Sequence, residues 1–266
     1  MLLSDAERCH YNTNTIHEVI CQLRFSPILT IETREPADFQ EQIRDTFPRY
    51  KAQKETPPAK VIQQNGTQRV EPGTPLTNHT FLSENNLWKL NLTRDFIALS
   101  TLRYTKWEDF AAMLDKTLAA FIGTYRPSFF ERIGLRYMNF VSREKLGLSA
   151  EPWTELIESP YLGVLAEDDT IGKIERFSTD FEMSLPGGNA HCKVHAGPAR
   201  LQLGVPGKPP QPDTEEKFIL DFDFSMQGSI TPALAAAGLE TLHSYSYPFF
   251  RGAITDTLHN AMEPTD

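Results

Sequence analysis

Two closely spaced arginines are the side chains in this 266-residue sequence whose types and spacing are best suited to chemistry. Arg132 and Arg136 flank Gly134 within the run Phe130 to Asn139. On an extended chain, residues at even spacing share one face, so both guanidinium groups would point the same way with little bulk between them. Two forked donors in that arrangement could hold a carboxylate or a phosphate bidentately.

A purely structural role for these arginines is the competing interpretation, and it is the one that we favour. Glu18 is a natural ion-pair partner for Arg132 or Arg136 if the strands that carry them are neighbours. A long arginine also covers apolar surface with its stem. The ligand interpretation assigns a small anion to a site made of Arg132, Arg136, Glu18 and Asn139, although alternation places Asn139 on the opposite face from the arginines.

One cluster resembles a metal site. His191 and His195 share a face of the predicted strand, whereas Cys192 points to the other face, so the three cannot easily bind one ion. Lys193 lies between the histidines on their face and would repel a cation. We therefore predict no metal site, and no cofactor.

Two further groups could carry chemistry. Asp221 and Asp223 alternate with apolar residues and could form an acid/base pair or bind a cation, but we expect the solvated side of a half-buried strand. The final helix holds a run of aromatic residues that we predict to form an interaction surface, because aromatic side chains dominate interface energetics. Its residues are His243, Tyr245, Tyr247, Phe249 and Phe250. A histidine in the core is the alternative for His243.

The sequence lacks the common catalytic motifs. Neither a glycine-rich phosphate loop nor Gly-x-Ser-x-Gly, His-Glu-x-x-His or Cys-x-x-Cys occurs in it. We therefore expect binding rather than catalysis: an interaction module with a protein partner or a second copy of itself, and a small-anion sensor or enzyme as the alternative.

Bulk properties narrow the partners. The net charge of −9 argues against a nucleic-acid partner, since affinity for nucleic acid comes mainly from clustered Lys and Arg. The three cysteines, Cys9, Cys21 and Cys192, are too scattered for a disulfide framework. No leader-like segment and no long apolar run are evident. We expect a cytoplasmic protein without a membrane partner.

Periodicity and turn residues predict the elements that must position these groups. In the first part we expect a strand over 16–25 with an extension over 28–31, and then a helix over 36–50. A Pro-, Gln- and Gly-rich loop over 53–77 follows, with a short strand over 60–63. Strands over 79–83, 87–92 and 96–102 and a helix over 107–125 complete this part. In the second part we expect a strand over 129–141, a short helix over 153–157, strands over 174–185, 190–195, 200–205 and 217–224 with a loop over 207–215, and a closing helix over 232–262 bent at Pro248.

This order of elements occurs twice. Each half has a strand, an insertion, a strand meander and a helix, and Leu23-Arg24-Phe25 in the first half echoes Leu135-Arg136-Tyr137 in the second. We predict an α+β fold of two tandem pseudo-repeats, 1–127 and 128–266, with helices packed on one face of antiparallel sheets.

Three segments carry a resemblance to a known family. They are Tyr11 to Phe25, Phe96 to Phe140 with its Phe130-Glu131-Arg132-Ile133-Gly134-Leu135-Arg136-Tyr137-Met138-Asn139 run, and Leu242-His243 followed by Phe250 and Ala253-Ile254-Thr255. Together they resemble a sporadically distributed family of uncharacterised bacterial proteins known by its sequence profile. The resemblance implies no activity, substrate or cofactor. Its patchy distribution suggests an accessory module of an operon, for example one related to defence or toxins.

Overall fold

The computed structural model describes residues 2–64, 67–167, 173–186, 189–203 and 211–265. The protein is a mixed α+β structure with a large antiparallel sheet and helices, in agreement with the predicted fold class. The chain divides into two compact units that interleave in the sequence. Unit 1 comprises Met1–Val19, Gly134–Gln227 and Ala236–Asp266, and unit 2 comprises Ile20–Ile133 and Gly228–Ala235.

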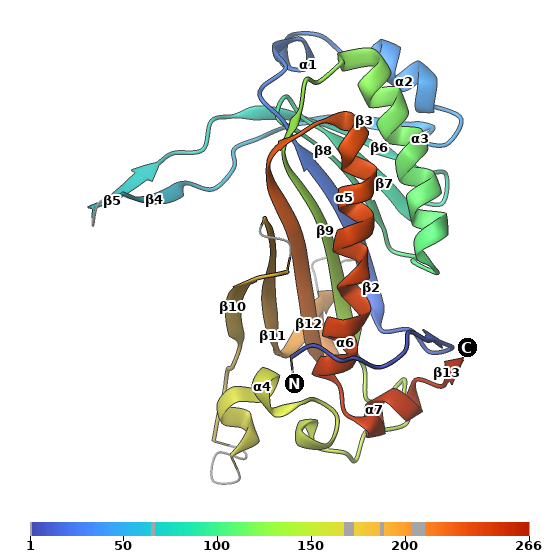
Figure 1. The fold of residues 1–266 in the computed structure, drawn as a ribbon, viewed down its shortest axis with the longest axis vertical. Coiled ribbons are helices and arrows are strands. Elements are labelled where there is room, and N and C mark those ends of the chain that lie inside the picture. The colour runs from blue at the N-terminus through green and yellow to red at the C-terminus, as the bar shows by residue number, and fades with distance from the viewer. Residues whose placement is uncertain (1, 65–66, 168–172, 187–188, 204–210, 266) are drawn as a thin grey trace. The chain divides into compact units, whose positions relative to one another are not determined.

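In unit 2 the strands follow the order β2-β8-β7-β6-β3 (Figure 1). Their bounds are β2 (Ile16–Arg24), β3 (Arg49–Glu55), β6 (Leu76–Leu82), β7 (Trp88–Leu92) and β8 (Phe96–Thr101). β6, β7 and β8 form the predicted meander, with Phe81 opposite Leu90 and Leu90 opposite Leu99. Two short helices, α1 (Leu29–Thr33) and α2 (Ala37–Ile43), precede β3.

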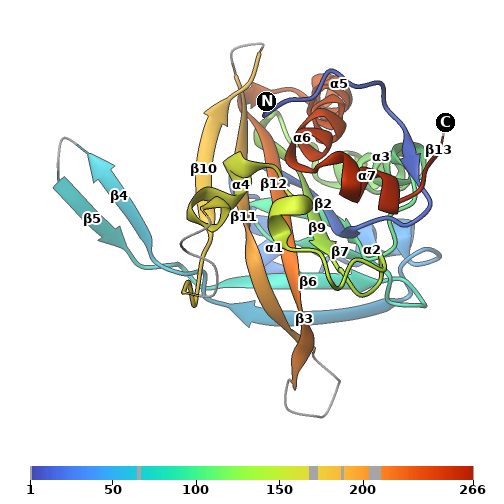
Figure 2. The ribbon, with the colours of Figure 1, turned by 90° about the horizontal axis from the view of Figure 1, so that it is seen from below.

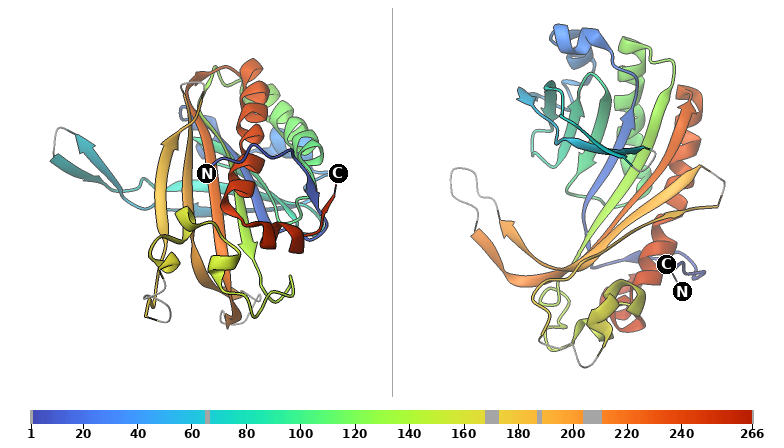
Figure 3. Two further views of the ribbon diagram at one scale, coloured as in Figure 1. Left: turned by 60° about the horizontal axis from the view of Figure 1, so that its bottom comes forward. Right: turned by 90° about the vertical axis from the view of Figure 1, so that its left-hand side faces the viewer.

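Helix α3 (Trp107–Tyr125) covers one face of these strands (Figure 3). Apolar residues recur every three or four positions along it, and the side chains of Leu114 and Leu118 meet Leu90 and Leu99 in the core. The helix ends at Arg126, whose left-handed backbone (φ 50°) forms the cap ahead of a proline. This helix was predicted with its observed bounds.

A two-stranded hairpin of unit 2 extends from the end of β3 as an arm (Figures 1 and 2). Its strands, β4 (Lys60–Gln64) and β5 (Thr67–Glu71), pair only with each other. The legs of the arm cross at Gly73, where a Cβ atom would overlap the carbonyl oxygen of Pro57, so only glycine fits there. The loop predicted over 53–77 is thus largely strand. The error arose because β3 is exposed along its whole length, which leaves no apolar alternation to detect.

In unit 1 the strands follow the order β10-β11-β12-β9. Their bounds are β9 (Phe130–Val141), β10 (Thr179–Ser184), β11 (Ala190–Leu203) and β12 (Gln211–Ile230). β2, β9, β12 and the helix α5 (Pro232–Ser244) each have residues in both units. The two strands predicted over 190–195 and 200–205 are one strand in the described part, and the predicted loop over 207–215 is strand from residue 211 onward.

The remaining elements of unit 1 are short. They are β1 (His10–Tyr11), β13 (Pro264–Thr265), the 3₁₀ helices η1 (Trp153–Glu155) and η2 (Gly163–Ala166), and α4 (Ser159–Leu162). The predicted closing helix is three helices, α5 (Pro232–Ser244), α6 (Ser246–Ala253) and α7 (Asp256–Ala261). α5 ends at Ser244 because the ring of Pro248 would clash with the carbonyl group four residues earlier.

Two smaller differences complete the comparison with the predicted elements. Residues 29–31 belong to α1, with Ile28 as its N-cap, rather than to an extension of the strand, and Tyr50 lies in β3 rather than at the end of a helix. Among the residues that the model describes, no helix is long and apolar enough to cross a membrane.

Candidate functional site

Arg136 is held in an internal ion pair within unit 1. Its Nε donates to Oδ1 of Asp221 at 2.8 Å, and a terminal nitrogen donates to Oδ2. The side chain of Asp221 is only 8% exposed, whereas that of Arg136 is 42% exposed. The hydrogen bonds that Arg136 donates to Asp221 raise the pKa of Arg136, and the charges of Asp223 and Glu18 add to this effect. The guanidinium fork is therefore already occupied by a carboxylate.

The predicted partner of this ion pair was Glu18, and the structure gives Asp221 instead. Asp221 was expected on the solvated side of a half-buried strand. In the structure the residue is only 6% exposed, so this expectation is wrong for Asp221. It lies on β12, the strand next to β9, 85 positions from Arg136 in the sequence. No local pattern identifies strands so far apart as neighbours, which explains the miss.

The predicted anion site requires the guanidinium groups of both Arg132 and Arg136. The guanidinium of Arg136 is already bonded to Asp221 and cannot serve such a site. Arg132 belongs to unit 2, where its charge acts on the buried thiol of Cys21. Burial raises the pKa of that thiol, and the guanidinium partly offsets the rise.

Asn139 serves the interior of unit 1. It is 3% exposed, as expected for the face opposite the arginines. Its Nδ2 donates to the carbonyl oxygen of Leu220 at 3.2 Å, and its Oδ1 accepts a hydrogen bond from the hydroxyl of Thr15, also at 3.2 Å. Both ends of the amide are thus used to hold neighbouring segments, not to bind a ligand.

The aromatic run after α5 packs inward. His243 is buried and its Nδ1 lies 2.7 Å from the hydroxyl of Tyr137. Phe249 is fully buried against Phe222 and Phe224, with ring centroids 5.8 and 5.2 Å apart. The alternative of a core histidine thus describes His243, and Phe249 does not form the exposed interaction surface predicted for this run.

The other three members of that run are also engaged within unit 1. Phe250 is 9% exposed and meets the ring of Tyr11 edge-on. The hydroxyl of Tyr245 donates to the carbonyl oxygen of Pro186 at 2.9 Å, and the hydroxyl of Tyr247 lies 3.4 Å from Sγ of Cys9. Phe250 is therefore largely covered within unit 1, and the two tyrosines are half-buried.

The histidine and cysteine cluster on β11 is split between the two faces of the sheet. Cys192 is buried, and burial raises the pKa of its thiol. Nδ1 of His195 lies 2.7 Å from the carboxylate of Asp180, and Lys193 pairs with Glu182 at 3.6 Å on the same exposed side. No group of three or more residues able to bind a metal occurs within the described ranges.

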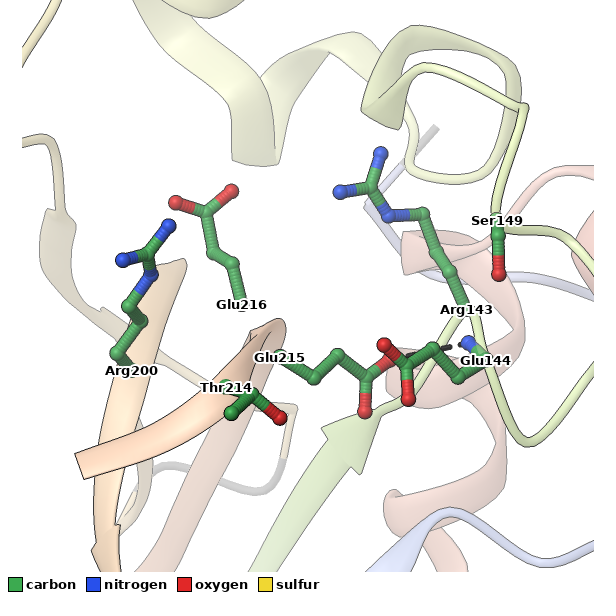
Figure 4. A pocket seen from close by; sticks show the side chains of 7 residues that line it. All are labelled: Arg143, Glu144, Ser149, Arg200, Thr214, Glu215 and Glu216. Atoms are coloured by element: carbon green, nitrogen blue, oxygen red, sulfur yellow. Dashed lines mark hydrogen bonds between the residues drawn. The ribbon is translucent and has the colours of Figure 1, made fainter. Parts of the chain in front are cut away.

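A polar cleft of about 280 Å³ opens in unit 1 (Figure 4). Its lining residues are Arg143, Glu144, Ser149, Arg200, Thr214, Glu215 and Glu216. The Arg143 guanidinium lies 4.2 Å from the ring centroid of Trp153 and donates to the carbonyl oxygen of Glu151. Trp153 in turn donates its ring N–H to Glu216 at 3.2 Å. These contacts occupy two of the charged groups that line the cleft.

Glu215 is the most heavily engaged residue of this cleft. Burial alone would raise the pKa of its carboxyl, but three donors outweigh that effect and lower it: the Glu144 N–H, the Ser142 hydroxyl and the Lys217 ammonium. The dashed line in Figure 4 marks the bond to the Glu144 N–H at 3.0 Å. Arg143, Glu215 and Glu216 are thus each engaged by neighbouring groups of unit 1.

A second cleft, of about 340 Å³, lies in unit 2 where the arm meets the sheet. It is lined by Gln22, Arg24, Pro57, Pro58, Glu71, Pro72, Gly73, Thr74, Leu76, Arg94, Asp95 and Phe96. Unlike Arg136, the two arginines in this cleft are not bound to a carboxylate within the described part of the chain. In the sequence, Arg24 was noted only as the middle residue of the repeated Leu-Arg-aromatic triplet. No sequence pattern indicated a functional role for Arg94.

Models of known protein families and curated proteins were both compared with this chain, and neither comparison finds a match. The resemblance to a bacterial family therefore stays a prediction.

Proposed function

We propose that the protein acts by binding a protein partner, with the β4–β5 arm as the main contact, and that it performs no catalysis. The observation that carries this proposal is the arm itself, a hairpin beside which no third strand lies in the described part of the chain. An isolated two-stranded hairpin is only marginally stable in water. A partner that packs against the arm would supply the contacts that it lacks within its own chain.

Exposure supports the same role. Val70 on β5 is 63% exposed, although its side chain is apolar. All seven residues of β3, which leads into the arm, are exposed, and β3 is paired on one side only, with β6. Exposed strand edges of this kind are common sites for pairing with another chain. The lysines on β3 would favour a partner surface with negative charge.

The residues best suited to chemistry already form hydrogen bonds within the protein, and this favours binding over catalysis. Arg136, Asn139 and His243 each hold another part of unit 1 through hydrogen bonds. A catalytic group needs to reach a substrate, and these groups reach neighbouring strands and helices instead.

Site-specific photo-crosslinking in the native host tests this proposal. A photoreactive amino acid at Val70 should yield a discrete crosslinked protein, because this position lies on the arm. The matched control is Asp115, an exposed position on α3, which should not yield that product. Crosslinking that is absent at Val70, or equal at both positions, would count against the arm as the contact.

The identity of the crosslinked protein also addresses the bacterial family. If the chain belongs to the resembled family and serves an operon, the partner should be the product of a neighbouring gene. A crosslinked second copy of this chain would instead support self-association through the arm.

We further propose that the fold arose from a tandem duplication with its seam near Pro127. In each half the leading strand pairs with the last strand of the meander that follows it: β2 with β8, and β9 with β12. A helix then follows directly, α3 in the first half and α5 in the second. Sequence profiles of the two halves, built separately from related chains, should align at the Leu-Arg-aromatic triplets; alignment elsewhere or nowhere would contradict the duplication.

A further inference from the structure

We propose that the cleft of unit 2 between Arg24 and Arg94 binds a small oxyanion, a carboxylate or a phosphate. This site is separate from the surface of the arm proposed to bind a protein. It also differs from the predicted anion site, because neither Arg132 nor Arg136 lines it.

Arg24 supplies the first free guanidinium. It lies at the end of β2, and no hydrogen bond or ion pair joins its side chain to any other residue that the model describes. Its half-buried side chain lines the cleft, and no ion pair with Glu71 or Asp95, which also line it, is formed. A partly desolvated guanidinium without a partner is a strong donor for a bidentate oxyanion.

Arg94 supplies the second. Its Nε is buried and has no acceptor within the described part of the chain. Because this atom is inaccessible, an oxyanion in the cleft would engage the terminal nitrogens of the Arg94 guanidinium. Two arginines from separate segments, one on β2 and one on the turn before β8, thus line one cleft.

The carboxylates near these arginines are already engaged elsewhere. Asp95 accepts a hydrogen bond from the hydroxyl of Thr93 at 2.9 Å, and Glu71 lies 3.7 Å from Arg69. Glu32, whose pKa is lowered first by the backbone N–H of Thr77 and also by the charge of Arg94, has both oxygens bonded to Thr77. These carboxylates moderate the positive charge, which suits an anion of one or two charges better than a polyanion.

The walls of the cleft are shaped for a small molecule. Pro57, Pro58 and Pro72 come from the two legs of the arm, and Phe96 comes from the sheet. Prolines hold their backbone in a fixed conformation, and the tight crossing at Gly73 fixes the legs relative to each other. A volume of about 340 Å³ lies at the lower end of the range for small-ligand sites.

Titration calorimetry at low ionic strength with two probes, inorganic phosphate and succinate, tests the proposal. We expect at least one probe to bind, and Arg24→Met or Arg94→Met to weaken its affinity at least about tenfold. The matched control is Arg103→Met, which removes the same charge from an exposed position outside the cleft and should leave the affinity within about twofold. Urea unfolding of each variant confirms that it is folded.

The outcomes separate the two sources of the oxyanion. Binding of phosphate alone identifies a phosphate site, and binding of succinate alone identifies a carboxylate site. Binding of neither probe overturns the proposal, as does binding that Arg24→Met and Arg94→Met leave unchanged. Because no protein partner is present in this experiment, its result does not depend on the role of the arm.

Discussion

Arg136 and Arg24 occupy the same local sequence pattern and have opposite environments. Each is the middle residue of a Leu-Arg-aromatic triplet on a leading strand, and each is half-buried. Arg136 is bound at two points by Asp221 of the adjacent strand, whereas Arg24 lines a cleft and has no carboxylate partner among the described residues. The neighbouring strand therefore decides whether such an arginine holds the fold together or remains available to a ligand.

The largest effect should come from breaking the ion pair. Arg136→Met leaves the buried carboxylate of Asp221 without its partner, and we expect the free energy of unfolding to fall by about 3 kcal/mol. Urea unfolding at neutral pH measures this change.

A double variant shows whether the loss comes from the unpaired charge. Arg136→Met with Asp221→Leu removes both charges and should recover most of the stability lost by the single variant. If the double variant is no more stable than Arg136→Met, the effect comes from lost packing instead.

A smaller, pH-dependent effect is expected at Glu215. Its pKa is lower in the folded protein than its ordinary value, so the carboxylate stabilises the fold above that value and loses this contribution as the pH falls. Glu215→Gln should lower the free energy of unfolding by about 1 kcal/mol at pH 7.

The pH profile provides the control for Glu215. The difference between the wild type and Glu215→Gln should shrink as the pH falls below about 4.5, where the unfolded chain becomes protonated. A difference that stays constant from pH 7 to about pH 3.5 would contradict the role of the charged carboxylate.

The smallest effect should come from Arg24. Arg24→Met removes a guanidinium that forms no ion pair with the described residues, so the free energy of unfolding should change by less than about 0.5 kcal/mol. The same urea experiment measures it beside Arg136→Met. A loss as large as that of Arg136→Met would remove the contrast between the two arginines and weaken the case for the cleft as a ligand site.

Much of the fold could be predicted from the sequence because regular apolar periodicity directly reports burial. β2, the meander, α3 and β9 have clear alternation or helical spacing, and they lie where expected. The short strand over 60–63 was predicted and corresponds to β4, but β3 was not predicted, since a strand that is exposed along its whole length carries no apolar pattern. The closing helix was overextended because Pro248 was expected to bend it rather than to end α5 four residues earlier.

The sites were harder to predict than the elements. The alternation of β9 correctly separated the buried Asn139 from the half-buried Arg136. It could not reveal that Asp221 would be the partner of Arg136, since pairing between distant strands is set by the whole sheet. Arg94 had no signal at all, because its significance depends on the legs of the arm and on Arg24, which meet only in the folded chain.

The glycine at the crossing of the two legs also bears on how this protein can change over evolutionary time. Because Gly73 packs tightly against the backbone of Pro57, the two legs of the arm are held together at this point, where the arm leaves the sheet. Insertions, deletions and substitutions within 60–71 would then alter the arm without disturbing the core of unit 2. If the arm binds a partner as proposed, a lineage could change that partner by replacing the arm while keeping the glycine.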